Sequence, residues 1–344
     1  MTAMRDEIGQ QAQIVADMAA DAGPFEAAAA EARAAGVRFV LYAARGTSDN
    51  AAVFGKYLAT IAAGLPCGLA VPSAATVYKA HVDLNSCLVI GISQSGETPD
   101  VAEYVARARS AGAFTLAITN EPDSRLAGVA HRALLTGAGV ERAVAATKTY
   151  TSQLAALALF WSAWTGQAGM AAALREQVPQ AMNAALALEE GAADIAARLS
   201  HANRLLVTGR GYNYATALEA ALKVEETCYL PALPFSAADL RHGPIAVIER
   251  RYPVLLFALA GATFDGMLEL HEDLCSRGAQ TFVVTDGDDE FAGAAGVLRL
   301  AVVPEEVSPL VAIVPGQLFA LRLSLARGLD PDRPRGLRKV TRTL

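Results

Sequence analysis

The chain has 344 residues, of which 53% are hydrophobic and 19% charged, and its formal net charge is −6. This length and composition suffice for two globular domains, each with its own core. The acidic balance argues against nucleic acid or an anionic membrane as a partner. The four cysteines are widely spaced, which argues against a disulfide framework and favours reduced thiols packed in cores.

The sequence also lacks the usual patterns of secretion and membrane insertion. Arg5, Asp6 and Glu7 stand near the start with no apolar core behind them, unlike a signal peptide. The longest apolar run, residues 154–164, is too short to cross a bilayer and is typical of a buried helix. We therefore expect a cytoplasmic protein with no membrane partner.

After a helical region over residues 1–35, strand patterns alternate with helix patterns. Apolar runs of strand length form two series, at residues 37–42, 87–92, 114–119 and 133–135, and then at 204–208, 252–259, 280–285 and 298–302. Helical patterns lie between these runs, and a long one follows each series, at 147–164 and 310–327. Alternation of buried strands with helices predicts parallel sheets covered on both faces.

This alternation predicts an α/β protein of two similar domains, each a flavodoxin- or Rossmann-like three-layer sandwich with a mostly parallel sheet. We place the first domain at residues 36–168 and the second at 200–327, with an Ala-rich connecting helix at 169–199. The tail, residues 328–344, is basic and interrupted by two prolines. It cannot form a helix, so it is either a disordered end or an extended strap.

One polar loop stands out between an apolar strand and a helix pattern that begins near Thr98. Its sequence over residues 91–100 is GISQSGETPD. The unpaired N–H groups and the dipole of a helix start attract anions, and the hydroxyls of Ser93, Ser95 and Thr98 can bond phosphate oxygens. Gly96 permits close approach of the backbone. The loop contains no Lys or Arg, which favours a single phosphate; the alternative is an ordinary Ser-rich turn with a helix cap.

Two further loops follow a strand and open a helix. They read RGTS at residues 45–48 and GRGY at residues 209–212, which indicates a loose duplication of the two halves. In open parallel sheets, ligands bind beyond the carboxyl ends of the strands. We expect all three loops to lie on that side of their sheets.

Six segments in the same order match one known family. They are RGTS at 45–48, SQSGET at 93–98, ERAVAATK at 141–148, KVEE at 223–226, DLRHGP at 239–244 and the pair RK at 338–339. Together they make nearly the whole chain resemble the paired sugar isomerase (SIS) domains of glucosamine-6-phosphate synthase. The resemblance implies two SIS domains, a hexose or hexosamine 6-phosphate as substrate, a homodimer, and no metal or cofactor.

Departures from the synthase pattern bear on the reaction. The synthase carries an N-terminal glutaminase domain that releases ammonia, whereas this chain starts Met1-Thr2-Ala3, so we expect that ammonia supply to be missing. Arg45 replaces a cysteine usual in the synthase and Ala146 replaces a serine, so the sugar-binding loop is altered. The end of the chain resembles isomerase-type glucosamine-6-phosphate deaminases, whereas Glu97-Thr98 resembles the synthase, which leaves the subfamily open.

The resemblance assigns residues to substrate binding. Those assigned to the phosphate or to the loop beside it are Ser93, Gln94, Ser95, Thr98, Arg45, Gly46, Thr47 and Ser48. Val144 and Ala146 would line the sugar. Arg338 would lie in a tail that the resemblance makes an ordered strap over the site.

The resemblance also assigns the catalytic residues. Glu226 would move a proton between C1 and C2, and Lys223 shares its helix face at a spacing of three; an ordinary surface ion pair is the alternative interpretation. His242 lies in a loop, and because histidine titrates near neutrality it suits opening of the sugar ring. In the family this histidine reaches the active site of the neighbouring subunit. Lys339 would form an imine with the open-chain carbonyl, helped by basic neighbours in the tail.

We therefore expect an enzyme that converts glucosamine 6-phosphate to fructose 6-phosphate and ammonia, or runs the reverse with free ammonia. Two alternatives stay open. One is a fructosamine-6-phosphate deglycase or another aldose–ketose phosphate isomerase, which would use the same proton transfer. The other is a sugar-phosphate sensor that binds without turnover, although a sensor has no need of Glu226, His242 and Lys339.

Overall fold

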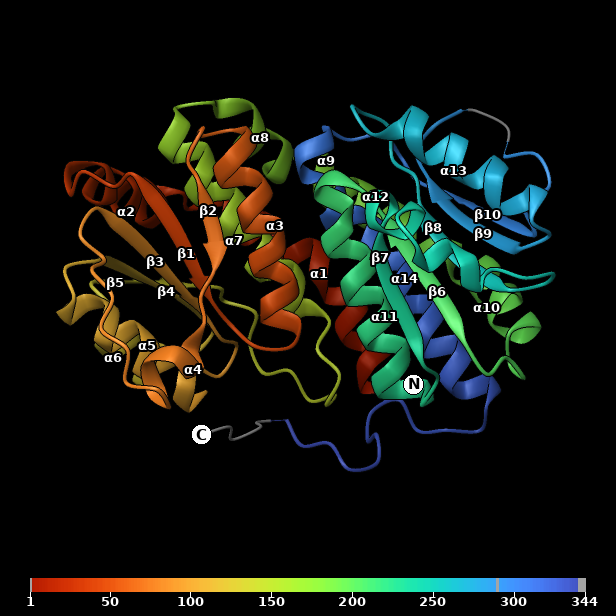
Figure 1. Cartoon of the computed structure of the whole chain (residues 1–344), viewed down its shortest axis with the longest axis horizontal. Coiled ribbons are helices and arrows are strands. Elements are labelled where there is room, and N and C mark those ends of the chain that lie inside the picture. Colours follow the sequence, from red (N-terminus) through yellow and green to blue (C-terminus); the bar gives the residue numbers. More distant parts are fainter. Residues whose placement is uncertain (1, 289–290, 340–344) are drawn as a thin grey trace. The chain divides into compact units, whose positions relative to one another are not determined.

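The computed structural model describes residues 2–288 and 291–339, and the chain divides into two compact units (Figure 1). The β1–β5 unit consists of Gln13–Glu141, Lys148–Arg175 and Arg338–Leu344. The β6–β10 unit consists of Met1–Ala12, Arg142–Thr147 and Glu176–Leu337. Each unit is built on one five-stranded parallel sheet.

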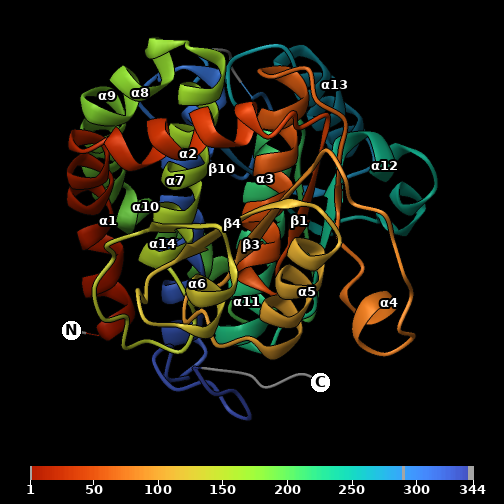
Figure 2. The same cartoon turned by 90° about the vertical axis from the view of Figure 1, so that its left-hand side faces the viewer.

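The first sheet has the strand order β2-β1-β3-β4-β5. Its strands are β1 (Phe39–Ala43), β2 (Cys67–Leu69), β3 (Cys87–Ile92), β4 (Phe114–Thr119) and β5 (Arg132–Leu135). The helices of this unit are α2 (Gly23–Ala34), α3 (Thr47–Ile61), α4 (Pro72–Thr76), α5 (Pro99–Ser110), α6 (Arg125–Val129), α7 (Lys148–Thr165) and α8 (Ala168–Arg175). Figure 2 shows α2 lying across α7.

Helices cover both faces of this sheet because its strands are apolar on both sides. On one face, Val89 of β3 packs with Val101 and Val105 of α5. On the other face, the hydroxyl of Tyr42 donates to the carbonyl of Gly55 in α3 (2.7 Å) and accepts from the indole N–H of Trp161 in α7 (3.0 Å). All six residues of β3 are buried, as expected of a central strand.

The second sheet has the order β10-β9-β8-β6-β7. Its strands are β6 (Leu205–Gly209), β7 (Ala232–Ser236), β8 (Pro253–Phe257), β9 (Gln280–Thr285) and β10 (Gly296–Arg299). Its α-helices are the first turns of α1 (Ala3–Ala20), then α9 (Gln177–Ala185), α10 (Glu189–Arg198), α11 (Tyr214–Cys228), α12 (Ala237–Arg241), α13 (Phe264–Ser276) and α14 (Ser308–Ala326). Among the described residues, short 3₁₀ turns lie at Leu186–Leu188, Gly211–Asn213, Pro244–Val247 and Glu305–Val307.

The two sheets share one topology. The order β7-β6-β8-β9-β10 repeats the order β2-β1-β3-β4-β5, which gives the predicted duplication a structural basis. The predicted α/β class, with two parallel sheets and helices on both faces, is confirmed.

The observed elements differ from the predicted ones in the connecting helix and at the sheet edges. The single helix predicted at 169–199 is wrong, because that segment forms three separate helices, α8, α9 and α10. The strands at 87–92, 114–119 and 280–285 have the predicted bounds. The edge strands β2 and β7 are absent from the prediction because the first has only three half-buried residues and the second contains a proline. The last predicted strand, 298–302, instead ends at Arg299.

One helix is long and apolar enough to cross a membrane, among the residues that the structure describes. It runs from Glu305 to Ala326 and contains α14, and 83% of its most apolar window is buried inside the protein. Its hydrophobic length is therefore used in packing: Ser324 donates to the Thr227 carbonyl of α11 (2.9 Å), and Cys228 donates to the Ala320 carbonyl.

The tail is an ordered strap as far as Lys339. The carboxylate of Asp332 accepts the backbone N–H groups of Ala3 (2.7 Å) and Met4 (2.8 Å), so it caps the start of α1. Arg335 donates its backbone N–H to the Tyr229 hydroxyl (2.6 Å), and its guanidinium stacks 4.2 Å from the centre of that ring. These contacts favour the strap over the disordered end.

Candidate active site

The predicted phosphate loop is a compact turn between β3 and α5, and we call residues 93–98 the serine loop. The hydroxyl oxygens of Ser93 and Thr98 lie 2.9 Å apart, and Ser93 Oγ also accepts the N–H of Gly96 (3.1 Å). Ser95 Oγ accepts the N–H of Glu97 (3.3 Å). The loop therefore gathers three hydroxyls at one helix start, which suits a phosphate group.

Only glycine fits at position 96 of this loop. Gly96 has φ = +62°, and a Cβ built there would lie 2.1 Å from Ser124 Oγ and 2.9 Å from Thr119 Oγ1. Both neighbours are buried, and Ser124 is itself the N-cap of α6. The backbone of the loop is therefore fixed against the ends of β4 and α6.

The serine loop lies at the topological switch point of the first sheet. Strands β1 and β3 are parallel neighbours, with Ala43 paired to Gly91 at their carboxyl ends. The chain leaves β1 towards β2 on one side and β3 towards β4 on the other, which opens a crevice where ligands of such sheets bind. The loop after β1, residues 45–48, shares this edge.

An ion pair connects the loop after β1 to the first turn of α5, directly after the serine loop. The guanidinium Nη2 of Arg45 lies 2.5 Å from Oδ2 of Asp100, which is buried in the first turn of α5. Ser48, at the start of α3, accepts the side-chain amide N–H of Gln153 in α7 (3.0 Å). The structure thus brings the predicted residues 45–48 beside the predicted residues 93–98.

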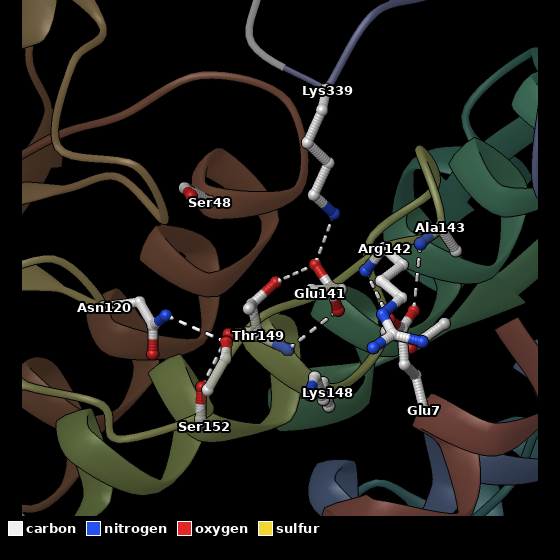
Figure 3. A network of polar contacts seen from close by, with 12 residues as sticks. Glu7, Ser48, Asn120, Glu141, Arg142, Ala143, Lys148, Thr149, Ser152 and Lys339 are labelled. Carbon is white, nitrogen blue, oxygen red and sulfur yellow. Dashed lines mark hydrogen bonds and ion pairs between the residues drawn. The ribbon is translucent and has the colours of Figure 1, made fainter. Parts of the chain in front are cut away.

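A second polar network surrounds the buried carboxylate of Glu141, 5% exposed, in the β1–β5 unit (Figure 3). It accepts the backbone N–H of Thr149 (3.1 Å) and the Thr149 hydroxyl (2.6 Å) at the start of α7. It also accepts the ammonium of Lys339 at 2.6 Å. The tail lysine that the resemblance made catalytic is therefore anchored by a carboxylate.

The segment that follows Glu141 belongs to the β6–β10 unit, where Glu7 of α1 holds it. The Glu7 carboxylate accepts the backbone N–H groups of Arg142 and Ala143 (Figure 3). The N–H of Val144 donates to the Asp332 carbonyl of the tail (3.3 Å), and both Val144 and Ala146 are half-buried. The tail strap therefore runs along the predicted sugar-lining segment.

Helix α11 carries a buried charge triad in the β6–β10 unit. The ammonium of Lys223 lies 2.6 Å from Oε2 of Glu226 and 3.3 Å from Oε1 of Glu219. Lys223 and Glu219 are fully buried, whereas 23% of the Glu226 side chain is exposed. This burial rules out the alternative of an ordinary surface ion pair.

The triad keeps Lys223 charged. Burial alone would lower the pKa of its ammonium, but the charges of Glu219 and then Glu226 outweigh this effect and raise the pKa above the usual range. A permanently charged lysine beside one partly exposed carboxylate fixes the position of that carboxylate. Glu226 is thus held at a partly exposed position by a buried ammonium group.

His242 lies in the same unit, directly after α12. Its backbone N–H donates to the Asp239 carbonyl (3.0 Å), and its side chain is exposed. Within the described part of the chain, no group of three or more His, Cys, Asp or Glu side chains could hold a metal ion.

In the second sheet, the loop after β8 corresponds to the serine loop. Its backbone N–H groups already donate to carboxylates of the protein itself. After β8, the N–H of Ala260 donates to Asp286 (2.6 Å) and the N–H of Ala262 donates to Glu305 (3.0 Å). The sequence of residues 259–264, LAGATF, has a single hydroxyl. Two negative charges on the amides would repel a phosphate, so the first sheet is the better candidate.

Comparison with known protein families matches the SIS domain twice, at residues 36–163 and 198–327. The chain belongs to the SIS domain family. The family therefore supplies the two domains that the resemblance predicted, each centred on one of the observed sheets.

Individual SIS relatives agree with this assignment. The chain is 37% identical to a glutamine–fructose-6-phosphate aminotransferase (isomerizing) of Pyrococcus horikoshii over 87% of its length and 51% of the relative's. A candidate phosphosugar isomerase from Silicibacter pomeroyi has a TM-score of 0.89 and 32% identity, covering 96% of this chain and all of that one. The C-terminal domain of a glucosamine-fructose-6-phosphate aminotransferase from Francisella tularensis gives a TM-score of 0.89 at 26% identity, covering 97% of this chain and 98% of that one. The chain spans about half the length of the curated relatives it matches.

Three residues of this SIS site were not assigned a role from sequence: Asp100, Glu141 and Glu219. Glu219 had a signal, because it lies four residues before Lys223 and so shares its helix face. Glu141 had none beyond its place in the matching segment 141–148, and Asp100 had none, since the cations that they meet are 198 and 55 positions away in the chain.

Proposed function

We propose that this chain is a SIS enzyme that interconverts glucosamine 6-phosphate and fructose 6-phosphate with release or uptake of free ammonia. The observation that supports it best is the triad on α11. A protein that only binds sugar phosphates gains nothing from a buried, permanently charged lysine fixed 2.6 Å from a partly exposed carboxylate. A proton-transfer enzyme needs such a carboxylate held in place.

The substrate class follows from the serine loop and from the relatives. Hydroxyls at a helix start at the switch point suit a monophosphate, and the loop itself carries no cation that a triphosphate would call for. A relative 37% identical is named a glutamine–fructose-6-phosphate aminotransferase (isomerizing), which supports a hexose 6-phosphate as the ligand. In this proposal Ser93, Gln94, Ser95 and Thr98 bind the phosphate.

The proposed deamination proceeds through proton transfers that balance. His242 would move a proton from the C1 hydroxyl to the ring oxygen and open the ring. Glu226 would remove the C2 proton and return it to C1, while the proton lost by the C2 nitrogen balances the one gained at O1. Lys339 would then displace ammonia from the resulting C2 imine, and water would hydrolyse the lysine imine to fructose 6-phosphate and free lysine, so that one water is consumed for each ammonia released.

Lys223 and Lys339 have different tasks in this scheme. Lys223 stays charged between two carboxylates, so it positions Glu226 and takes no part in proton exchange. Lys339 would form the imine at C2 in exchange for ammonia, after passing a proton to Glu141 at 2.6 Å. We propose a cytoplasmic homodimer in which the exposed His242 completes the neighbouring subunit's site.

The test is turnover of the purified chain with a panel of sugar phosphates. Ammonia release from glucosamine 6-phosphate, and its reverse from fructose 6-phosphate with ammonium, are the expected activities. Much faster cleavage of a fructosamine 6-phosphate would instead identify a deglycase. Binding of these compounds with no turnover of any of them would contradict the enzyme and leave a sensor.

A further inference from the structure

The serine loop has no cation of its own, but the structure supplies one from the neighbouring loop. Arg45 follows β1, and its guanidinium reaches across to Asp100 in the first turn of α5, at 2.5 Å. This first turn is the helix start at which the serine loop ends. The first turn of α5 is therefore paired with a cation that comes from outside the serine loop.

The Arg45 side chain has donors left that could bind an anion as well. It contacts the Asp100 carboxylate and, through Nη1 at 3.2 Å, the carbonyl of Ala44, and its positive charge also acts on the nearby carboxylate of Asp49. A guanidinium has five N–H donors in a rigid fork, so others remain for a second acceptor. With 44% of the side chain exposed, these donors are open to solvent.

Asp100 positions the Arg45 side chain at the start of α5. Its side chain is 6% exposed and lies where an acidic group is favoured by the helix dipole. Left alone, its negative charge would repel a phosphate at the same helix start. Paired with Arg45, it loses that repulsion and fixes Nη2 of the guanidinium at the start of α5.

We propose that Arg45 is a phosphate-recognition residue of this chain and that Asp100 is the positioning residue that aims it. This inference rests on the proposed function for the identity of the sugar but needs only the phosphate for its test. It makes the site select dianionic phosphate esters over neutral sugars more strongly than hydroxyls and backbone amides alone would. Asp100 acts through Arg45 and touches no reacting atom.

The test measures steady-state kinetics with glucosamine 6-phosphate and competitive inhibition by inorganic phosphate, for wild type, R45A, R45K, D100N and R45A/D100N. The matched control is R107A, which removes an arginine of the same helix whose Nε lies 2.7 Å from the Glu103 carboxylate. We expect R45A to raise KM and the phosphate inhibition constant roughly 10- to 100-fold, the range for a charge-assisted hydrogen bond. kcat should change little, because the phosphate is bound equally in ground and transition states.

The double variant separates direct contact from mere neutralisation of Asp100. If Arg45 binds phosphate, R45A/D100N stays as weak as R45A, and R45K lies between R45A and wild type because it keeps charge without the fork. Wild-type phosphate inhibition in R45A/D100N, or in R45A, would overturn the proposal. Melting temperatures of all variants identify any that fail to fold. If the Arg45 variants fail, D100N provides the test, because loss of the positioning carboxylate should raise the inhibition constant of inorganic phosphate.

Failure of this inference is distinguishable from failure of the proposed function. If wild type turns over no sugar phosphate, direct calorimetric binding of inorganic phosphate to wild type and R45A still decides the role of Arg45. If wild type is active and R45A is indistinguishable from it, Arg45 is no phosphate residue and the enzyme assignment stands.

Discussion

The ammonium of Lys223 lies 2.6 Å from the carboxylate of Glu226, three residues further along the same helix, and is fully buried. On an exposed helix such a pair contributes only about 0.2–0.5 kcal/mol. Here Lys223 also faces the fully buried Glu219, so the pair belongs to a desolvated triad that includes one extra negative charge. Such groups cost free energy to bury, and their fixed geometry is what a catalytic carboxylate requires.

Replacing Lys223 should destabilise the fold more than any surface change. The substitution K223M leaves the buried carboxylate of Glu219 without its cation, which we expect to lower the free energy of unfolding by about 3–5 kcal/mol. Urea unfolding measures this. The double variant E219Q/K223M, which removes both buried charges, should recover much of the loss. Equal stability of K223M and the double variant would show that the triad is not coupled.

Replacing Glu226 should affect turnover and leave binding intact. E226Q keeps the size of the side chain and removes the base, so we expect kcat to fall by about 10²–10⁴ with little change in KM. The matched control is E225Q, the same change at the exposed neighbouring residue, whose carboxylate accepts the Ala232 N–H at 3.4 Å. Comparable loss in E225Q would mean that charge on α11, and not a proton acceptor, is responsible.

Position 96 should tolerate glycine alone. G96A places a Cβ at φ = +62° and 2.1 Å from Ser124 Oγ, so the loop must shift or strain by about 1–3 kcal/mol. We expect lower thermal stability and a raised KM for sugar phosphates. G128A is the control, because a Cβ at this residue of α6 meets nothing within 4 Å. A normal KM in G96A would remove the serine loop from the phosphate site.

Acid should destabilise the protein partly through His271. Burial lowers the pKa of this histidine, which is 1% exposed and hydrogen-bonded to the Ala292 carbonyl at 3.1 Å. The unfolded chain then binds the proton more tightly than the folded one, so stability present above pH about 6.5 is lost as the pH falls. H271Q should flatten the fall in unfolding free energy between about pH 7 and 5. The exposed His201 offers the control H201Q, which should leave the curve unchanged.

What the sequence could predict depends on how far apart the interacting residues lie. The serine loop forms by hydrogen bonds between residues three and five positions apart, and Lys223 meets Glu226 at a spacing of three, so local pattern is enough. The central strands are apolar on both sides and have their predicted bounds. The edge strand β7 lacks that signal because only one of its five residues is buried and it contains a proline.

Long-range contacts carry no local signal. The cap of α1 by Asp332 joins residues 328 and 329 positions apart, and the Arg45–Asp100 pair joins two different loops. Prolines in the tail exclude a helix, but they do not say where an extended segment docks. Family resemblance indicated that the tail is ordered, and the contacts of Asp332 and Arg335 explain why.

Glu141 should hold the tail in place through Lys339. E141Q keeps an acceptor for Thr149 but removes the charge that pairs with the Lys339 ammonium at 2.6 Å, so we expect the tail to open more often. Faster trypsin cleavage after Arg338, and a fall in kcat of about 10- to 100-fold if Lys339 forms the imine, are the expected results. E121Q, at an exposed glutamate, is the control. Unchanged cleavage and unchanged kcat in E141Q would separate Glu141 from the tail, because a carboxylate that serves only to cap Thr149 has no influence on either measurement.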